Sequence, residues 1–166
     1  METEVIYNIT EVRELARRYP ELVRQESRRV MDLIVRRLEK DVVEGTPKGV
    51  GGQAGLAGST QGEVVMFGQS VRGMVGQPLE YGEVVELGRR PGKAMPPVEP
   101  IALWARSKLG VPADEAKSVG FAIARKIAEK GFEGAHMFEK AWNRNEAWIQ
   151  SQLGTIPMRV QRRLSA

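Results

Sequence analysis

His136 is the only imidazole in the chain, and the chain has no cysteine. Catalysis through this histidine would need an orienting partner and a nucleophile, and the sequence carries a signature of neither. Ser59, Ser70 and Ser107 lack the G-x-S-x-G setting of an activated serine. Without thiols, thiolate zinc sites, iron–sulfur clusters and cysteine nucleophiles are excluded. We therefore predict no catalytic residue, no metal ligand and no cofactor-binding residue.

A glycine-rich segment at residues 45–62 raises the question of phosphate binding, because seven of its eighteen residues are glycine. A P-loop needs G-x-x-x-x-G-K-[ST] between a strand and a helix. Here Lys48 precedes most of the glycines, and the flanking patterns run from helix to strand, which is the wrong order for a phosphate at a helix N-terminus. We predict a loop that is mobile in the isolated subunit and becomes ordered against a partner.

A basic cluster, Arg89, Arg90 and Lys93, lies in a loop that contains three prolines. Such a cluster can contact DNA phosphates or a neighbouring protein's carboxylates, or it can simply be a solvated turn. Three glutamates shortly before it argue against a continuous DNA-binding stripe. We retain the cluster as a candidate assembly interface.

A second basic group is at the end of the chain, where Arg159, Arg162 and Arg163 occur without any acid. The net charge is +4, so the rest of the chain carries only +1. Gly154 and Pro157 are expected to end the preceding helix, and apolar residues then alternate with polar ones as in a strand. We predict an extended basic tail over residues 155–166 whose three arginines meet acidic residues on an adjacent subunit or another partner protein, or alternatively a frayed terminus.

The helices and strands that must position these residues are predicted from the spacing of apolar residues and from the glycines and prolines that end each element. Apolar residues at three- and four-residue steps predict a long helix over 20–44, and its mixed charges indicate a solvated face or an oligomer interface. Trp142 and Trp148 are six residues apart, so we expect one in the core and the other exposed. The remaining predicted elements are strands at 3–9, 63–67 and 71–75, a short strand or helical turn at 81–87, and helices at 97–109, 112–130 and 135–153.

This order of elements is typical of the α+β class: a long N-terminal helix, a small antiparallel β-sheet with long Gly-rich and Pro-rich loops, and a helical C-terminal half. A length of 166 residues fits about one domain, which we place at 1–154. No apolar run approaches the roughly 20 residues of a membrane span, and the N-terminus lacks the pattern of a signal peptide. We therefore expect no membrane contact and synthesis in a cytoplasm.

Two ordered series of motifs resemble a known family. The first is Thr46-Pro47-Lys48-Gly49 with the glycines and Ser59 that follow, and the second is Tyr81-Gly82 through Glu86 and Gly88 to Arg90-Pro91-Gly92 and Met95-Pro96-Pro97. A Trp104-bearing helix, the run Phe121 to Lys126, and Met137-Phe138 complete the series. Over residues 20–153 the chain resembles the HK97-type tail-component, or tail-completion, family of tailed bacteriophages, which is similar in role to the minor tail protein Z of phage lambda.

The resemblance implies a non-enzymatic virion protein of the neck or upper tail, assembled in the host cytoplasm. It implies copies arranged in a ring, six rather than twelve, that contacts the head connector or adaptor and the tail terminator or tail tube. Genomic DNA would pass through the channel without sequence-specific binding. Two alternatives stay open: a tail terminator that caps the tail tube, and, from another class, a small basic DNA-binding module.

Overall fold

Helices make up 60% of the chain and strands 16%, which confirms the predicted α+β class. The computed structural model describes residues 1–8, 12–49, 55–68, 70–79 and 81–166. The chain forms two compact units, where the sequence led us to expect one domain. Unit 1 comprises Met1–Gly45, Thr60–Gln77 and Met137–Ala166, and unit 2 comprises Thr46–Ser59 and Pro78–His136.

Unit 1 contains a three-stranded antiparallel sheet, made by β1 (Glu2–Asn8), β2 (Gln61–Phe67) and β3 (Ser70–Gly76). The strand order is β1-β3-β2, so β3 is central and the other two strands are edges. In the register, Gly73 of β3 is opposite Val5 of β1. The predicted strands at 63–67 and 71–75 are confirmed as β2 and β3, and the two pair antiparallel with each other.

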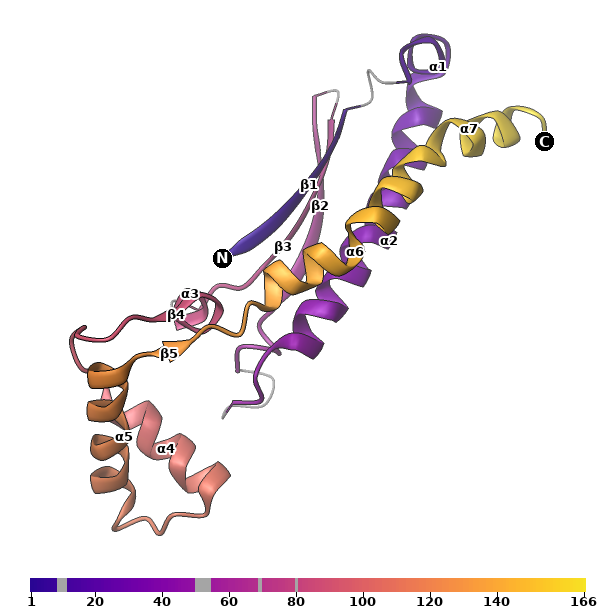
Figure 1. Ribbon diagram of the computed structural model, residues 1–166. Coiled ribbons are helices and arrows are strands. Elements are labelled where there is room, and N and C mark those ends of the chain that lie inside the picture. The colour runs from indigo at the N-terminus through magenta and orange to yellow at the C-terminus, as the bar shows by residue number, and fades with distance from the viewer. Residues whose placement is uncertain (9–11, 50–54, 69, 80) are drawn as a thin grey trace. The chain divides into compact units, whose positions relative to one another are not determined.

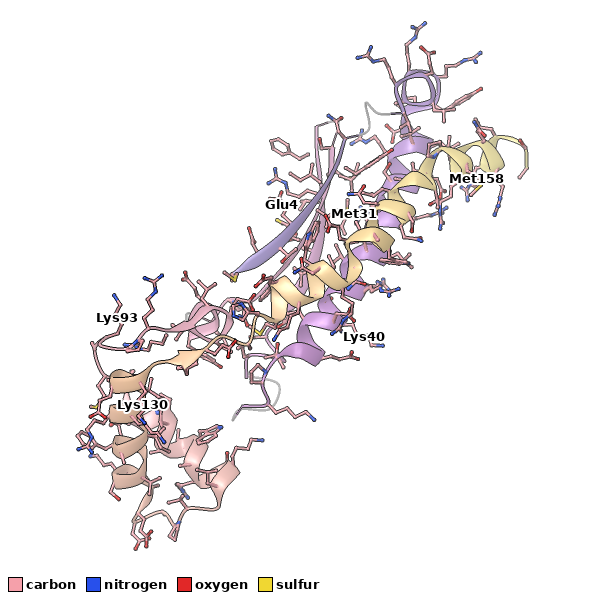
Figure 2. The ribbon with its side chains drawn as sticks, viewed as in Figure 1. Glu4, Met31, Lys40, Lys93, Lys130 and Met158 are labelled. Carbon is pink, nitrogen blue, oxygen red and sulfur yellow. The ribbon has the colours of Figure 1, made fainter. Side chains whose placement is uncertain are left out.

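The long helix α2 (Pro20–Gly45), which follows the short α1 (Arg13–Arg18), packs along one face of this sheet (Figure 1). A glycine in the central strand permits the close approach. A Cβ atom at Gly73 would lie 2.6 Å from Val35 Cγ2 and 2.7 Å from Met31 Sδ. Figure 2 labels Met31 on the sheet-facing side of α2. The predicted long helix is therefore confirmed, and it forms the second layer of unit 1 together with α6.

Helix α6 (Met137–Gly154) packs on α2, and the residues after it form a further helix, α7 (Ile156–Leu164), which also packs on α2. The predicted extended tail is wrong. Pro157 lies in the first turn of α7, where a missing N–H breaks no helical hydrogen bond. Ile156 and Val160 fit strand alternation, but they are also one helical turn apart, and both are completely buried.

The described residues of unit 2 form three helices and a pair of two-residue strands. Its elements are α3 (Tyr81–Leu87), β4 (Gly88–Arg89), α4 (Val98–Leu109), α5 (Ala116–Lys130) and β5 (Phe132–Glu133), with β4 and β5 antiparallel. Residues 81–87, for which the sequence left strand or helix open, are helical.

Small residues bring α4 and α5 together, side by side in Figure 1. A Cβ atom at Gly120 would lie 2.9 Å from the backbone nitrogen of Ala102. Gly110 directly follows Leu109 and ends α4 in the left-handed conformation, with a φ of 68°. The backbone N–H groups of Ala135 and His136 donate to carbonyls of α3, at 2.8 and 3.1 Å, so the last long helix begins at residue 137 rather than 135.

Candidate assembly interface

The basic cluster of unit 2 divides into one anchoring arginine and two exposed cations. Arg89 is half-buried, and its Nη2 donates to the carbonyl of Ala94. The backbone N–H of Gly92 donates to Ala128 O at 2.8 Å, which ties the same loop to α5. Arg90 and Lys93 are exposed, and Figure 2 labels Lys93 on this loop. Arg89 therefore shapes the loop, and the other two side chains present their charges to solvent.

The three C-terminal arginines also differ in their surroundings. Arg159 is half-buried, and its Nε donates to Thr155 Oγ1 at 3.0 Å. Arg163 Nε lies 4.0 Å from Oε1 of Glu26 on α2, a carboxylate that is 4% exposed and also pairs with Arg29 at 2.6 Å. Arg162 is exposed. Arg163 thus meets an acidic residue of its own chain, Glu26, where the sequence led us to expect an acid on another protein.

A polar network that the sequence did not lead us to predict joins α2 to α6. Asn145 of α6 is completely buried; it accepts a hydrogen bond from Arg37 Nε at 2.7 Å and donates to Asp41 Oδ2 at 2.6 Å. Its amide also donates to Ala141 O at 2.8 Å. The sequence did contain an indication of this buried amide. Asn145 lies four residues from the apolar Ala141 and four from the apolar Ile149, so all three share one face of the helix.

The two tryptophans of α6 are both half-buried, so the expected division into one core and one exposed side chain is wrong. The guanidinium of Arg37 lies 4.3 Å from the ring centroid of Trp148, which is a cation–π distance. Trp148 therefore belongs to the same α2–α6 contact as Asn145.

One face of the sheet is packed on α2, and the other carries exposed apolar side chains. This open sheet face is formed by Phe67, Ile6 and Val65, which are 72%, 54% and 37% exposed. Arg72 at its centre pairs with Glu4 at 2.5 Å, and its guanidinium lies 5.7 Å from the Phe67 ring centroid. In the part of unit 1 that the structure describes, the helices pack on the opposite side of the sheet.

Unit 2 has an apolar groove of about 470 Å³. Tyr81, Leu103 and Trp104 line it and are 49%, 55% and 36% exposed. Pro47, Leu56, Val85 and Pro100 add to its apolar wall, and Lys48 lines it as well. The groove thus presents aromatic rings and prolines to solvent.

The predicted glycine-rich loop is described only at its two ends, since residues 50–54 lie outside the described residues. At its beginning Thr46 is buried, and at its end Leu56 and Thr60 are buried. Ser59 N–H donates to Gly55 O at 3.0 Å, which closes a turn. The prediction that this loop orders on assembly remains a prediction.

Two of the serines considered for catalysis donate their hydroxyl hydrogen bonds to backbone carbonyls three residues away. Ser59 Oγ donates to Leu56 O at 3.0 Å, and Ser107 Oγ donates to Trp104 O at 3.3 Å, each within its own turn. His136 has a φ of 51°, in the left-handed region, and lies directly before the first residue of α6. Over the described residues, no three acidic or histidine side chains are grouped as metal ligands, and none of the helices has the length and apolarity to cross a bilayer.

The six candidate interface residues lie at two positions in the fold: Arg89 at the end of β4, with Arg90 and Lys93 in the loop that follows it, and Arg159, Arg162 and Arg163 on α7. The open sheet face and the groove of unit 2 are exposed apolar surfaces that the sequence did not single out. Comparison with protein-family models, curated proteins and solved structures finds no match to this chain.

Proposed function

We propose that this chain is a non-enzymatic virion protein of a tailed bacteriophage, a ring-forming neck or tail-completion component that joins the tail to the head connector. The proposal rests on the ordered series of motifs over residues 20–153 and on the open sheet face. The sheet face is the observation that carries it. Apolar patches of this kind on a soluble chain mark interaction sites, because a sheet buries its hydrophobic face against another element.

Two different apolar surfaces support a ring rather than a symmetric dimer. A ring uses two unlike surfaces of one subunit, each meeting the other kind on the next copy. The open sheet face and the groove of unit 2 are two such unlike surfaces. The proposed ring therefore needs no surface beyond those that the chain already exposes.

The distribution of charge favours an assembly role over DNA binding. Each neutralised phosphate contributes about −0.9 to the slope of log affinity against log salt. Arg163 lies against Glu26, Arg159 is half-buried, and Arg89 is bound to a carbonyl of its own loop. Because the net charge is only +4, we expect the logarithm of the DNA affinity to depend weakly on the logarithm of the salt concentration. Weak binding of this kind suits a protein through which the genomic DNA slides.

The test is deletion of the gene from its phage followed by electron microscopy of the lysate. We expect filled heads and tails of normal length that do not join, and recovery of infectious particles when purified wild-type protein is added. Tails of abnormal length would instead identify a tail terminator. Normally joined, infectious particles without the protein would overturn the proposal.

A pair of variants tests the sheet face within the same assay. Phe67→Asp changes a ring that is 72% exposed, so we expect the subunit to fold normally but to restore joining at least tenfold less well. Leu33→Asp is the matched control, because Leu33 is also an exposed apolar residue, 47% accessible on α2, but lies away from the sheet. Equal restoration of joining by both variants would show that the open sheet face is not an interface.

A further inference from the structure

The open sheet face carries acids as well as apolar side chains. Side chains two residues apart on a strand point to the same face, so Glu2 and Glu4 share the exposed face of Ile6 on β1. On β2, Glu63 shares the face of Phe67 in the same way. The register pairs both Glu4 and Glu63 with one residue of the central strand, so the acids form one half of the face and the apolar side chains the other half.

Acids are in excess on this face. The cation that the described strands contribute to it, Arg72, pairs with Glu4 at 2.5 Å. Among the described residues, Glu2 and Glu63 form no ion pair, and the acids outnumber the cations even when the amino group of Met1 is counted. A partner of the open sheet face therefore needs cations beside apolar side chains.

A strongly basic surface lies at one end of unit 1. It is formed by residues 12–29 and 155–166, which we call the arginine end and which contain nine arginines, three glutamates and no lysine. Even when Glu11, which lies outside the described residues, is included, their formal charge is +5, against +4 for the whole chain. Helices α1 and α7 both pack on α2, and Figure 2 shows side chains that end in nitrogen on both. The net positive charge of the chain is thus concentrated at this end.

The composition of the arginine end is that of a protein interface. Five of its exposed arginines form no ion pair among the described residues: Arg13, Arg17, Arg18, Arg28 and Arg162. The same segments include three exposed apolar side chains, since Tyr19, Met158 and Leu164 are 39%, 55% and 43% exposed. Arginine, tyrosine and methionine are enriched at protein interfaces, whereas lysine is depleted there. The arginine end therefore suits a protein surface that offers carboxylates and apolar side chains.

Helix α7 and the open sheet face are on opposite sides of unit 1. Helix α7 packs on α2, and α2 packs on the other face of the sheet (Figure 1). Figure 2 labels Glu4 on the sheet and Met158 on α7, with α2 between them. Helix α7 therefore cannot cover the sheet face of its own chain, and the occupant with the matching charge is a second copy. Two unlike surfaces on opposite sides of one unit can meet head-to-tail around a ring.

We propose that the arginine end of one copy docks, through α7, on the open sheet face of the next copy. The proposal rests on the ring proposed above and names one of the contacts that would build it. In this contact Met158 lies against Ile6 and Phe67, and Arg162 meets Glu63. Opposite charges of this kind guide the encounter and fix its register.

A charge swap tests the contact in the purified full chain, with self-association measured by analytical ultracentrifugation. Glu63→Arg and Arg162→Glu each place like charges in the contact, so we expect either variant to self-associate at least tenfold more weakly than the wild type. A mixture of the two variants is expected to recover association, because the reversed side chains then attract each other. The matched controls, Glu146→Arg on α6 and Arg106→Glu on α4, change exposed side chains outside both surfaces and are expected to have no effect. Equal association by the wild type, the variants and their mixture would overturn the proposal.

Because the chain has no cysteine, cross-linking gives a second measurement. The variants Ile6→Cys and Met158→Cys, one of them carrying an affinity tag, are mixed and joined with a bismaleimide, and the covalent heterodimer is measured. The matched control replaces Ile6→Cys with Leu109→Cys, because Leu109 is 56% exposed, against 54% for Ile6, but lies on α4 of unit 2. We expect at least tenfold more heterodimer from the first pair, and equal yields from both pairs would contradict the proposal.

Duplex DNA is the competing occupant of the arginine end, and the contact and the function can fail separately. If Arg162→Glu weakens the binding of duplex DNA at least tenfold while Glu63→Arg leaves self-association unchanged, the arginine end is a DNA surface and the docking contact is wrong. If head–tail joining needs the protein but the charge-swapped variants do not restore each other, the contact is wrong and the proposed function stands. If the swap restores association but the phage joins normally without the gene, the function is wrong and the contact stands.

Discussion

The buried amide of Asn145 is expected to contribute more to stability than any other polar side chain of α6. The Asn145→Ala variant removes the acceptor for Arg37 Nε and the donor to Asp41 Oδ2. A hydrogen bond to a charged group contributes about 1.5–3 kcal/mol. Arg37 is exposed and can exchange its lost partner for water, but the Asp41 side chain is only 13% exposed. We therefore expect a net loss of about 3 kcal/mol.

The assay is urea unfolding followed by helix circular dichroism. For a chain of this size the denaturant slope is about 1–3 kcal/mol per molar urea, so a loss of about 3 kcal/mol lowers the midpoint by roughly 1–3 M. Asn143→Ala is the matched control: the same substitution on the same helix at an exposed position, where we expect a change below about 0.5 kcal/mol. A loss at Asn145 no larger than at Asn143 would refute the claim that this network joins α2 to α6.

Three further predictions concern packing. Gly73→Ala places a methyl group within 3 Å of two α2 side chains, so we expect a loss of about 1–3 kcal/mol in urea unfolding, while Gly154→Ala, with no neighbour within 4 Å, costs nothing. Val160→Asp buries a charge between α7 and α2 and should make the last twelve residues rapidly cleavable by trypsin, whereas Met158→Asp, at a position 55% exposed, leaves the cleavage rate unchanged. Gly120→Val forces α5 away from the α4 backbone, so amide exchange should quicken by at least tenfold in α4 and α5 and not in the sheet.

Where the spacing of apolar residues and the positions of glycine and proline indicated the same boundaries, the sequence was sufficient to predict the helix or strand. In α2 the apolar residues are spaced three and four apart for more than twenty residues. The β2–β3 strand pair is bounded by glycine. The prediction of an extended C-terminal tail was wrong because the spacing of Ile156, Met158 and Val160 fits two patterns. All three fit the two-residue period of a strand, and Ile156 and Val160 also fit the four-residue spacing of a helix. Burial of Ile156 and Val160 on α2 decides between the two, and burial is a property of the tertiary structure.

The candidate site was less predictable than the fold for a similar reason. Val64 and Val65 are adjacent in β2 and equally apolar, so the sequence does not say which one faces the core; the direction is decided by Gly73, whose missing side chain admits α2 on one face only. The basic residues were easy to find by type, but their roles depend on distant partners. Arg163 meets Glu26 across more than a hundred residues of sequence, and no local pattern encodes that pairing.

The central claim, that this chain forms a ring in the phage neck, is tested most directly by cryo-electron microscopy of purified virions. The measurement is the density between the head connector and the tail tube, into which units 1 and 2 are fitted separately. We predict a closed ring of copies around the DNA, with the open sheet face of each copy, Phe67 included, covered by protein. A neck whose density is filled by other chains, or a ring in which Phe67 of every copy faces solvent, would contradict the claim.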